Sequence, residues 1–120
     1  MPLIKLQKSI IKSFFSREYL LKSNSDNLKM SMKQALINIV GKVQGVGYRY
    51  SAVHSAQKLN LSGYVRNMSD GSVEALVQGE ESSILQFIEW CKKGPSNAKV
   101  DQIHTLRQEV VDLYESFEIL

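Results

Sequence analysis

Residues 33–120 switch repeatedly between the two-residue period of a strand and the 3.6-residue period of a helix, and this alternation constrains the fold more than any other feature. The segments typical of strands are rich in aliphatic side chains and are bounded by turn residues. They are residues 34–40, 62–68, 72–78, 99–109 and 116–120. A Ser-Asp-Gly sequence at residues 69–71 predicts a hairpin turn between the second and third strands.

Two segments have apolar residues at helical spacing. The first helix is expected at residues 48–60 and the second at residues 80–93. The second is the stronger prediction, because apolar residues follow Ile84 at i+3, i+4 and i+7. Glutamates near its start and lysines near its end suit the helix dipole, and Gly94 ends it.

The resulting order, β-α-β-β-α-β with a short last strand, is the split βαβ arrangement of ferredoxin-like proteins. It predicts an α+β sandwich in which an antiparallel sheet carries both helices on one face. With 120 residues, the chain has room for one compact domain.

Residues 1–32 are expected to be a basic N-terminal extension, flexible or helical, that precedes a domain at residues 33–120. Residues 1–30 hold six Lys or Arg and two Asp or Glu side chains, whereas the rest hold nine basic and ten acidic ones. None of the seven glycines precedes Gly41. The extension is interpreted as a dispensable segment before a start at Met30 or Met32. An organelle-targeting segment and a helix that touches a membrane or a partner are the alternatives.

Composition excludes several classes of protein. No apolar run approaches the roughly 20 residues that span a bilayer. A single cysteine, Cys91, excludes an internal disulfide, and with two distant histidines it offers no zinc-ligand spacing. We therefore expect a cytoplasmic protein with no membrane segment and no metal.

The loop at residues 41–47 holds three of the seven glycines between the first strand and the first helix. Such a loop can turn successive N–H groups inward, and the helix dipole adds to them to form an anion cradle. Arg49, in the first turn of the helix, can close the cradle with two parallel N–H bonds. A tight connection followed by a surface arginine is the simpler interpretation of this segment alone. The loop lacks Walker and dinucleotide signatures, which argues against nucleoside triphosphates bound with magnesium.

Asn67 lies near the end of the predicted second strand, beside the turn. An amide there can hold a water molecule through its donor and acceptor atoms together. Capping of the turn is the simpler interpretation of this residue alone.

Together the two segments are more specific. The runs VQGVGYR (residues 43–49) and GYVRN (residues 63–67), with GSV and Gly79 after them, resemble the two signature motifs of the acylphosphatase family. The resemblance continues through EWCKKGP and AKVDQI and covers roughly residues 33–120. The family more often has phenylalanine at the position of Tyr48, and the N-terminal 30 residues have no counterpart in its typical member.

The resemblance implies hydrolysis of acyl phosphates to a carboxylate and inorganic phosphate, with no metal and no cofactor. Arg49 then takes the role of the phosphate-binding arginine, and Asn67 orients the attacking water. The phosphoryl oxygens are held by the backbone amides of Gln44, Gly45, Val46, Gly47 and Tyr48. The implied partner is a small-molecule acyl phosphate, and we expect a monomer that binds no nucleic acid.

Other polar and aromatic residues are assigned no chemistry. His54 is expected at the surface, His104 exposed or partly packed on a strand, and Cys91 in the core. Lys92 and Lys93 are interpreted as helix-end charges. Three aromatic residues are expected to serve packing: Tyr64, Phe87 and Trp90.

Two other functions fit the same fold. RNA-recognition domains share the element order, but they need exposed aromatic residues on the central strands, and the strand at residues 72–78 has none. A ferredoxin-like module that binds an anion without turning it over needs the same cradle. The presence of both Arg49 and Asn67 favours turnover.

Overall fold

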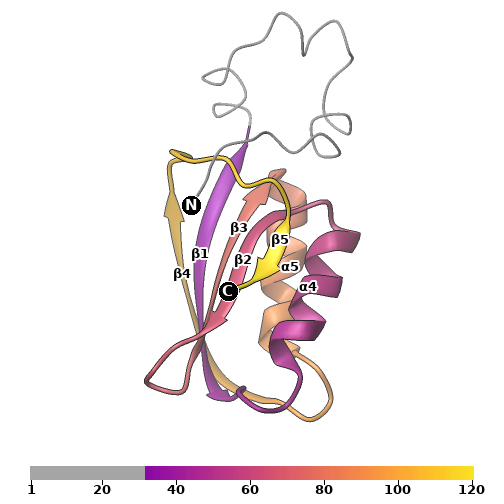
Figure 1. The fold of residues 1–120 in the computed structure, drawn as a ribbon, viewed down its shortest axis with the longest axis vertical. Coiled ribbons are helices and arrows are strands. Elements are labelled where there is room, and N and C mark those ends of the chain that lie inside the picture. Colours follow the sequence, from indigo (N-terminus) through magenta and orange to yellow (C-terminus); the bar gives the residue numbers. More distant parts are fainter. Residues whose placement is uncertain (1–31) are drawn as a thin grey trace, which may run out of the picture.

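The computed structural model describes residues 32–120 (Figure 1). The interpretations of the N-terminal extension concern residues that, Met32 aside, lie outside the described part. The elements are β1 (Lys33–Lys42), α4 (Tyr48–Lys58), β2 (Ser62–Asn67), β3 (Val73–Gly79), α5 (Glu81–Lys93), β4 (Lys99–Gln108) and β5 (Phe117–Ile119). Every expected strand and helix is present, with bounds that differ by two residues or fewer. No helix of the described part is long and apolar enough to cross a membrane.

The five strands form one sheet in the order β4-β1-β3-β2-β5. The pairs β1–β3, β1–β4 and β2–β3 are antiparallel, as the sequence predicts, but β5 pairs parallel with β2, so the sheet is mixed. The direction of β5 follows from the path of the chain. Residues 109–116 cross from one edge of the sheet to the other at the end where β2 begins, so β5 enters there and runs the same way (Figure 1).

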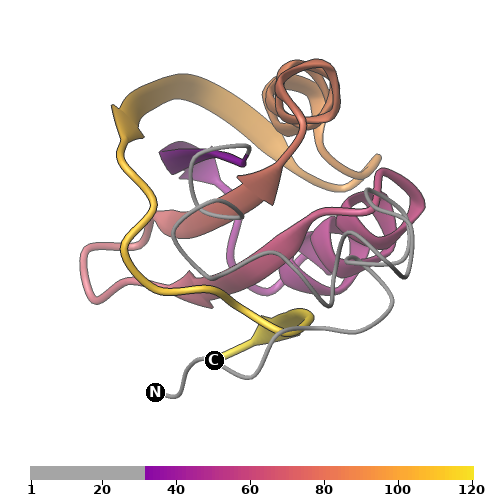
Figure 2. The same ribbon diagram turned by 90° about the horizontal axis from the view of Figure 1, so that it is seen from above.

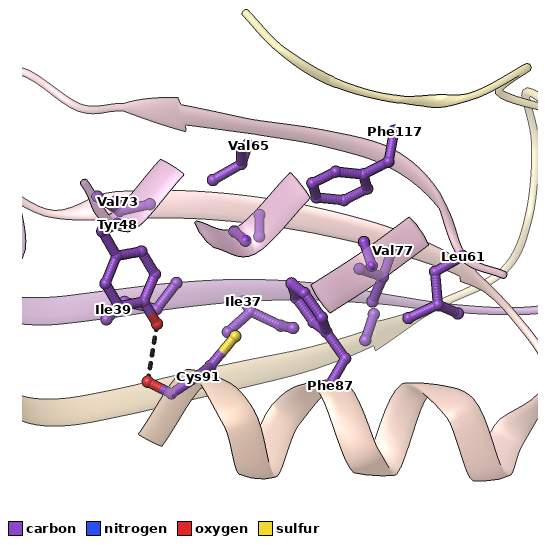
Figure 3. Packing of buried hydrophobic residues seen from close by; sticks show 14 of the residues in the cluster. Ile37, Ile39, Tyr48, Leu61, Val65, Val73, Val77, Phe87, Cys91 and Phe117 are labelled. Atoms are coloured by element: carbon purple, nitrogen blue, oxygen red, sulfur yellow. Dashed lines mark hydrogen bonds between the residues drawn. The ribbon is translucent and has the colours of Figure 1, made fainter. Parts of the chain in front are cut away.

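Both helices lie on one face of the sheet, as expected (Figure 2). The core between the layers contains alternate residues of β1, including Ile37 and Ile39, and the apolar stripe of α5. Phe87 from α5 is fully buried and its ring lies 5.9 Å from that of Phe117, the first residue of β5 (Figure 3). Full burial of a phenylalanine side chain adds about 2–3 kcal/mol to the free energy of unfolding, so this contact helps to hold the edge strand β5 on the sheet.

On the other face, the buried side chain of Gln78 holds the crossing segment. Its amide nitrogen donates to Gln34 Oε1 at 2.7 Å and to the Asp112 carbonyl at 2.6 Å. Its oxygen accepts from the Tyr114 N–H at 3.1 Å. The amide therefore uses both of its donors and its acceptor inside the protein, and no exposed surface remains on the residue.

Candidate active site

The sheet topology brings the two predicted motifs to the same end of the sheet. β1 and β2 both pair antiparallel with β3, so they run in the same direction and their C-terminal ends lie together. The glycine loop follows the end of β1, and Asn67 is the last residue of β2. Asn67 is exposed and lies on the same side of β2 as the buried Val65, which is the side that carries the helices. The loop, α4 and Asn67 therefore meet at one corner of the molecule.

The loop owes its shape to two glycines with left-handed backbone angles. Gly45 has φ 76° and Gly47 has φ 80°. A Cβ atom at either position would meet nothing within 4 Å, so these residues are needed for conformation and not for packing. Left-handed residues that alternate with ordinary ones turn successive N–H groups to the same side and form an anion-binding concavity.

The backbone donors of this loop lack partners among the residues that the structure describes. In residues 32–120, the N–H groups of Gln44, Gly45, Val46, Gly47 and Tyr48 donate to no protein acceptor. Gly47 is the N-cap of α4 and supplies no side-chain cap, and the first turn holds no acidic residue. Five donors and the positive end of the helix dipole thus remain available for a negatively charged ligand.

Arg49 lies in the first turn of α4, beside this loop, and is partly buried. No carboxylate of the described residues lies within 4.0 Å of its guanidinium, whereas Arg66 and Arg107 each form an ion pair. Its fork of N–H donors is therefore not occupied by an internal anion and can take two oxygens of one phosphoryl group.

Tyr48 fixes the start of α4 to the end of α5. Its ring is buried 5.2 Å from the ring of Trp90, and its hydroxyl donates to the Cys91 carbonyl at 2.7 Å (Figure 3). Burial raises the pKa of the Tyr48 hydroxyl far above its ordinary value, so the group stays a donor. The tyrosine ring therefore packs in the core, and its hydroxyl also satisfies a carbonyl in the last turn of α5.

The turn after Asn67 is held by its own side chains. Asp70 accepts from the Ser72 hydroxyl at 2.6 Å and from the Ser72 N–H at 2.9 Å. These two hydrogen bonds lower the pKa of the Asp70 carboxyl below its ordinary 3.8. Asn38 on β1 donates to the same hydroxyl at 3.0 Å. Asn67 is thus followed by an ordered turn.

The side chain of Gln44 links the loop to this turn. Its amide nitrogen donates to the Met68 carbonyl at 2.8 Å and to the Ser72 carbonyl at 2.9 Å. Only a backbone role is expected for Gln44 from the sequence, so this contact was not predicted, and neither was the interaction of Asp70 with Ser72. The Ser-Asp-Gly turn signal could have indicated the second contact, but no local pattern indicates the first.

The remaining candidate residues lie where the sequence places them. His54 and His104 are exposed, and Phe87 is buried. Burial raises the pKa of the Cys91 thiol to about 12, which leaves it protonated and unreactive near neutral pH. No group of three His, Cys, Asp or Glu residues within the described range is arranged to hold a metal ion.

The fold and this corner define the class: a ferredoxin-like α+β sandwich with a backbone anion cradle next to an arginine. The acylphosphatase family model matches residues 35–119. An acylphosphatase of Aliivibrio fischeri is 51% identical over 86 residues, which are 69% of this chain and 96% of that protein.

Two solved structures give the same result. An acylphosphatase from Coxiella burnetii superposes with a TM-score of 0.72 at 35% identity, over 77% of this chain and 96% of the other. The Bacillus subtilis acylphosphatase gives a TM-score of 0.71 at 36% identity, over 73% and 98%. This chain belongs to the acylphosphatase family, which acts on small-molecule acyl phosphates.

Proposed function

We propose that this chain hydrolyses acyl phosphates to a carboxylate and inorganic phosphate without a metal ion. The N–H groups of residues 44–48 and the guanidinium of Arg49 hold the phosphoryl oxygens, and the Asn67 amide orients the attacking water. The observation that carries this proposal is the set of five consecutive N–H groups of residues 44–48 that have no acceptor within residues 32–120. They lie beside Arg49, which forms no ion pair with any residue of that range.

The chemistry asks little more of the protein. Phosphoryl transfer depends mainly on positioning and on stabilisation of negative charge. Fixed N–H donors supply such stabilisation, at about 3 kcal/mol for a well-placed donor. The leaving carboxylate has a conjugate-acid pKa of about 4–5, so it departs without a general acid. Asn67 aligns the water through its amide and takes no proton from it. As the water oxygen bonds to phosphorus, the bond between phosphorus and the carboxylate oxygen breaks, and the proton of the water passes to a phosphoryl oxygen or to solvent.

An anion-binding module without turnover is the second candidate, because it would use the same cradle. The position of Asn67 favours hydrolysis, since it lies at the end of β2, and the turn that follows contacts the loop directly. Binding alone does not require a water-orienting amide there.

The two functions are separated by an assay on EDTA-treated protein. Benzoyl phosphate is expected to be cleaved, and p-nitrophenyl phosphate, a phosphate monoester, to be barely touched, since nitrophenolate is a poorer leaving group than a carboxylate. Inorganic phosphate is expected to compete with benzoyl phosphate. Binding of phosphate without any cleavage of benzoyl phosphate would establish the second candidate instead.

Two finer expectations belong to the proposal. The enzyme works as a cytoplasmic monomer, and it needs no nucleic acid or membrane partner. Sedimentation of the full chain, compared with a protein that starts at Met32, tests the first and shows whether the basic extension changes the oligomeric state.

A further inference from the structure

The hydrogen bonds of the Gln44 side chain connect two parts of the site that the sheet alone does not join. Met68 and Ser72 lie at the two ends of the β2–β3 turn, and the Met68 N–H donates to the Ser72 carbonyl at 2.8 Å. The Gln44 amide nitrogen lies 2.8 Å from the Met68 carbonyl and 2.9 Å from that of Ser72. No other hydrogen bond of residues 32–120 joins residues 43–47 to residues 68–72.

The chemistry of the partners fixes the orientation of this amide. Both partners are carbonyl oxygens, which only accept, so the nitrogen must face them and the oxygen must face away. The two hydrogens of the amide then serve one carbonyl each. A side chain without an N–H group at this position leaves both contacts unmade.

We propose that the Gln44 side chain is a positioning residue that holds Asn67 in register with the phosphate-binding loop. This inference rests on the proposed function and adds to it. The backbone N–H of Gln44 contacts the phosphoryl group, while its side chain acts through the turn and sets the place of the water-orienting amide.

The path from Gln44 to Asn67 is short. Asn67 directly precedes Met68, so the hydrogen bond to the Met68 carbonyl restrains the residue next to Asn67. Asp70 and Asn38 hold Ser72, but their bonds fix the turn to itself and to β1. Without Gln44, the distance between the loop and Asn67 depends on the sheet alone. A misplacement of about 1 Å at a reacting centre can slow the reaction about 100-fold.

The test compares Gln44→Met with Gln57→Met. Methionine has nearly the shape of glutamine but donates no hydrogen bond, and it adds no charge that would disturb an anion site. Gln57 is exposed on α4, and its side chain makes no hydrogen bond within the described residues. The measurements are kcat and KM for benzoyl phosphate, Ki for inorganic phosphate and the thermal midpoint.

Gln44→Met is expected to lower kcat by about 10- to 100-fold, because the water loses its alignment. The Ki for phosphate is expected to change by less than about threefold, since the loop N–H groups and Arg49 remain. Gln57→Met is expected to match the wild type. A kcat within twofold of wild type, or a loss confined to phosphate affinity, would overturn the inference. If Gln44→Met fails to fold, Gln44→Asn replaces it, because the shorter amide cannot reach both carbonyls.

A double-mutant cycle with Asn67→Ala separates positioning from a general loss of structure. If Gln44 acts through Asn67, Gln44→Met is expected to lower kcat by less than about threefold in the Asn67→Ala background. The same 10- to 100-fold loss in both backgrounds would show that Gln44 acts elsewhere. An inactive wild type would instead refute the proposed function, so the two failures are distinguishable.

Discussion

The two ends of the sheet are each held by a glutamine amide, but they treat their backbone polar groups in opposite ways. At the end where β1 begins, Gln78 is fully buried and satisfies the segment that crosses to β5. At the end where β1 finishes, Gln44 holds the turn after Asn67, while five N–H groups of its own loop have no acceptor in the described residues. At the first end, the polar groups around Gln78 hydrogen-bond to one another, whereas at the second end the loop N–H groups stay available for a ligand.

This difference shows where a small fold can keep unpaired hydrogen-bond donors for binding a ligand. A buried polar group without a partner costs about 1–3 kcal/mol, so most groups are paired. At the loop, Gly45 and Gly47 are exposed and Gln44 and Val46 partly so, and contact with solvent lowers that cost for their N–H groups. Substitutions at this corner are therefore expected to change activity, and substitutions at the Gln78 end to change stability.

The largest effect is expected at Arg49. In Arg49→Lys, an ammonium replaces the planar fork and cannot form two parallel bonds to one phosphoryl group, so kcat/KM for benzoyl phosphate is expected to fall by about 100-fold or more. Arg107→Lys, at an exposed ion pair near the other end of β1, is the matched control and is expected to keep the wild-type activity. Activity above one third of wild type in Arg49→Lys would remove the arginine from the site.

Asn67→Ala comes next. It removes the amide that aligns the water, and kcat is expected to fall by about 10- to 100-fold with little change in the Ki of inorganic phosphate. Steady-state kinetics with phosphate as competitor measures both quantities. An unchanged kcat would reduce Asn67 to the residue that ends β2.

Gln78→Met tests the Gln78 end of the sheet. It leaves Gln34 Oε1, the Asp112 carbonyl and the Tyr114 N–H without this partner, and the free energy of unfolding is expected to fall by about 3 kcal/mol. Because the active-site corner lies at the other end of the sheet, kcat of the folded protein is expected to stay within about twofold. Urea unfolding gives the free energy of unfolding, and kinetics at temperatures well below the thermal midpoint give kcat. A stable but inactive variant would contradict the separation of the two ends.

A smaller loss of stability is expected in Tyr48→Phe. The ring keeps its contacts, and only the hydrogen bond to the Cys91 carbonyl is lost, at a cost of about 1 kcal/mol. Activity is expected to remain, since Arg49 keeps its place in the first turn of α4. Thermal unfolding measures the loss, and a large drop in kcat would show that the hydroxyl contributes to the site.

The smallest effect is expected at Asp70, in the way the stability of the protein depends on pH. Because folding lowers the pKa of this carboxyl, its contribution to stability is present above the ordinary value of 3.8 and disappears as the pH falls through the lowered value. Asp70→Asn keeps an acceptor oxygen but cannot titrate. The acid limb of its unfolding midpoint is expected to be shallower than that of wild type, and identical limbs would exclude this contribution.

The sequence predicted the strands and the helices because each carries a local signal, whereas the roles of Arg49 and Asn67 stay predictions that rest on the family resemblance. Alternation fixes β1, the spacing after Ile84 fixes α5, and glycines at left-handed positions mark the loop. The parallel pairing of β5 was not predicted, since three residues carry no information about the direction of their partner.

The contacts of the two glutamine side chains could not be predicted from local sequence patterns either. Gln44 reaches residues 24 and 28 positions away, and Gln78 reaches residues 34 and 36 positions away. Only the folded sheet brings these atoms together. Both residues look like ordinary polar residues in the sequence, and the structure gives one a place in the site and the other a place in the core.

The most direct test of the account is an amide NMR titration of the metal-free protein with inorganic phosphate. We predict that the largest and saturable shifts fall on the backbone N–H groups of residues 44–48 and on the Arg49 side chain, with a midpoint equal to the kinetic Ki. If these signals stay in place while phosphate still inhibits hydrolysis, the loop is not the phosphoryl site.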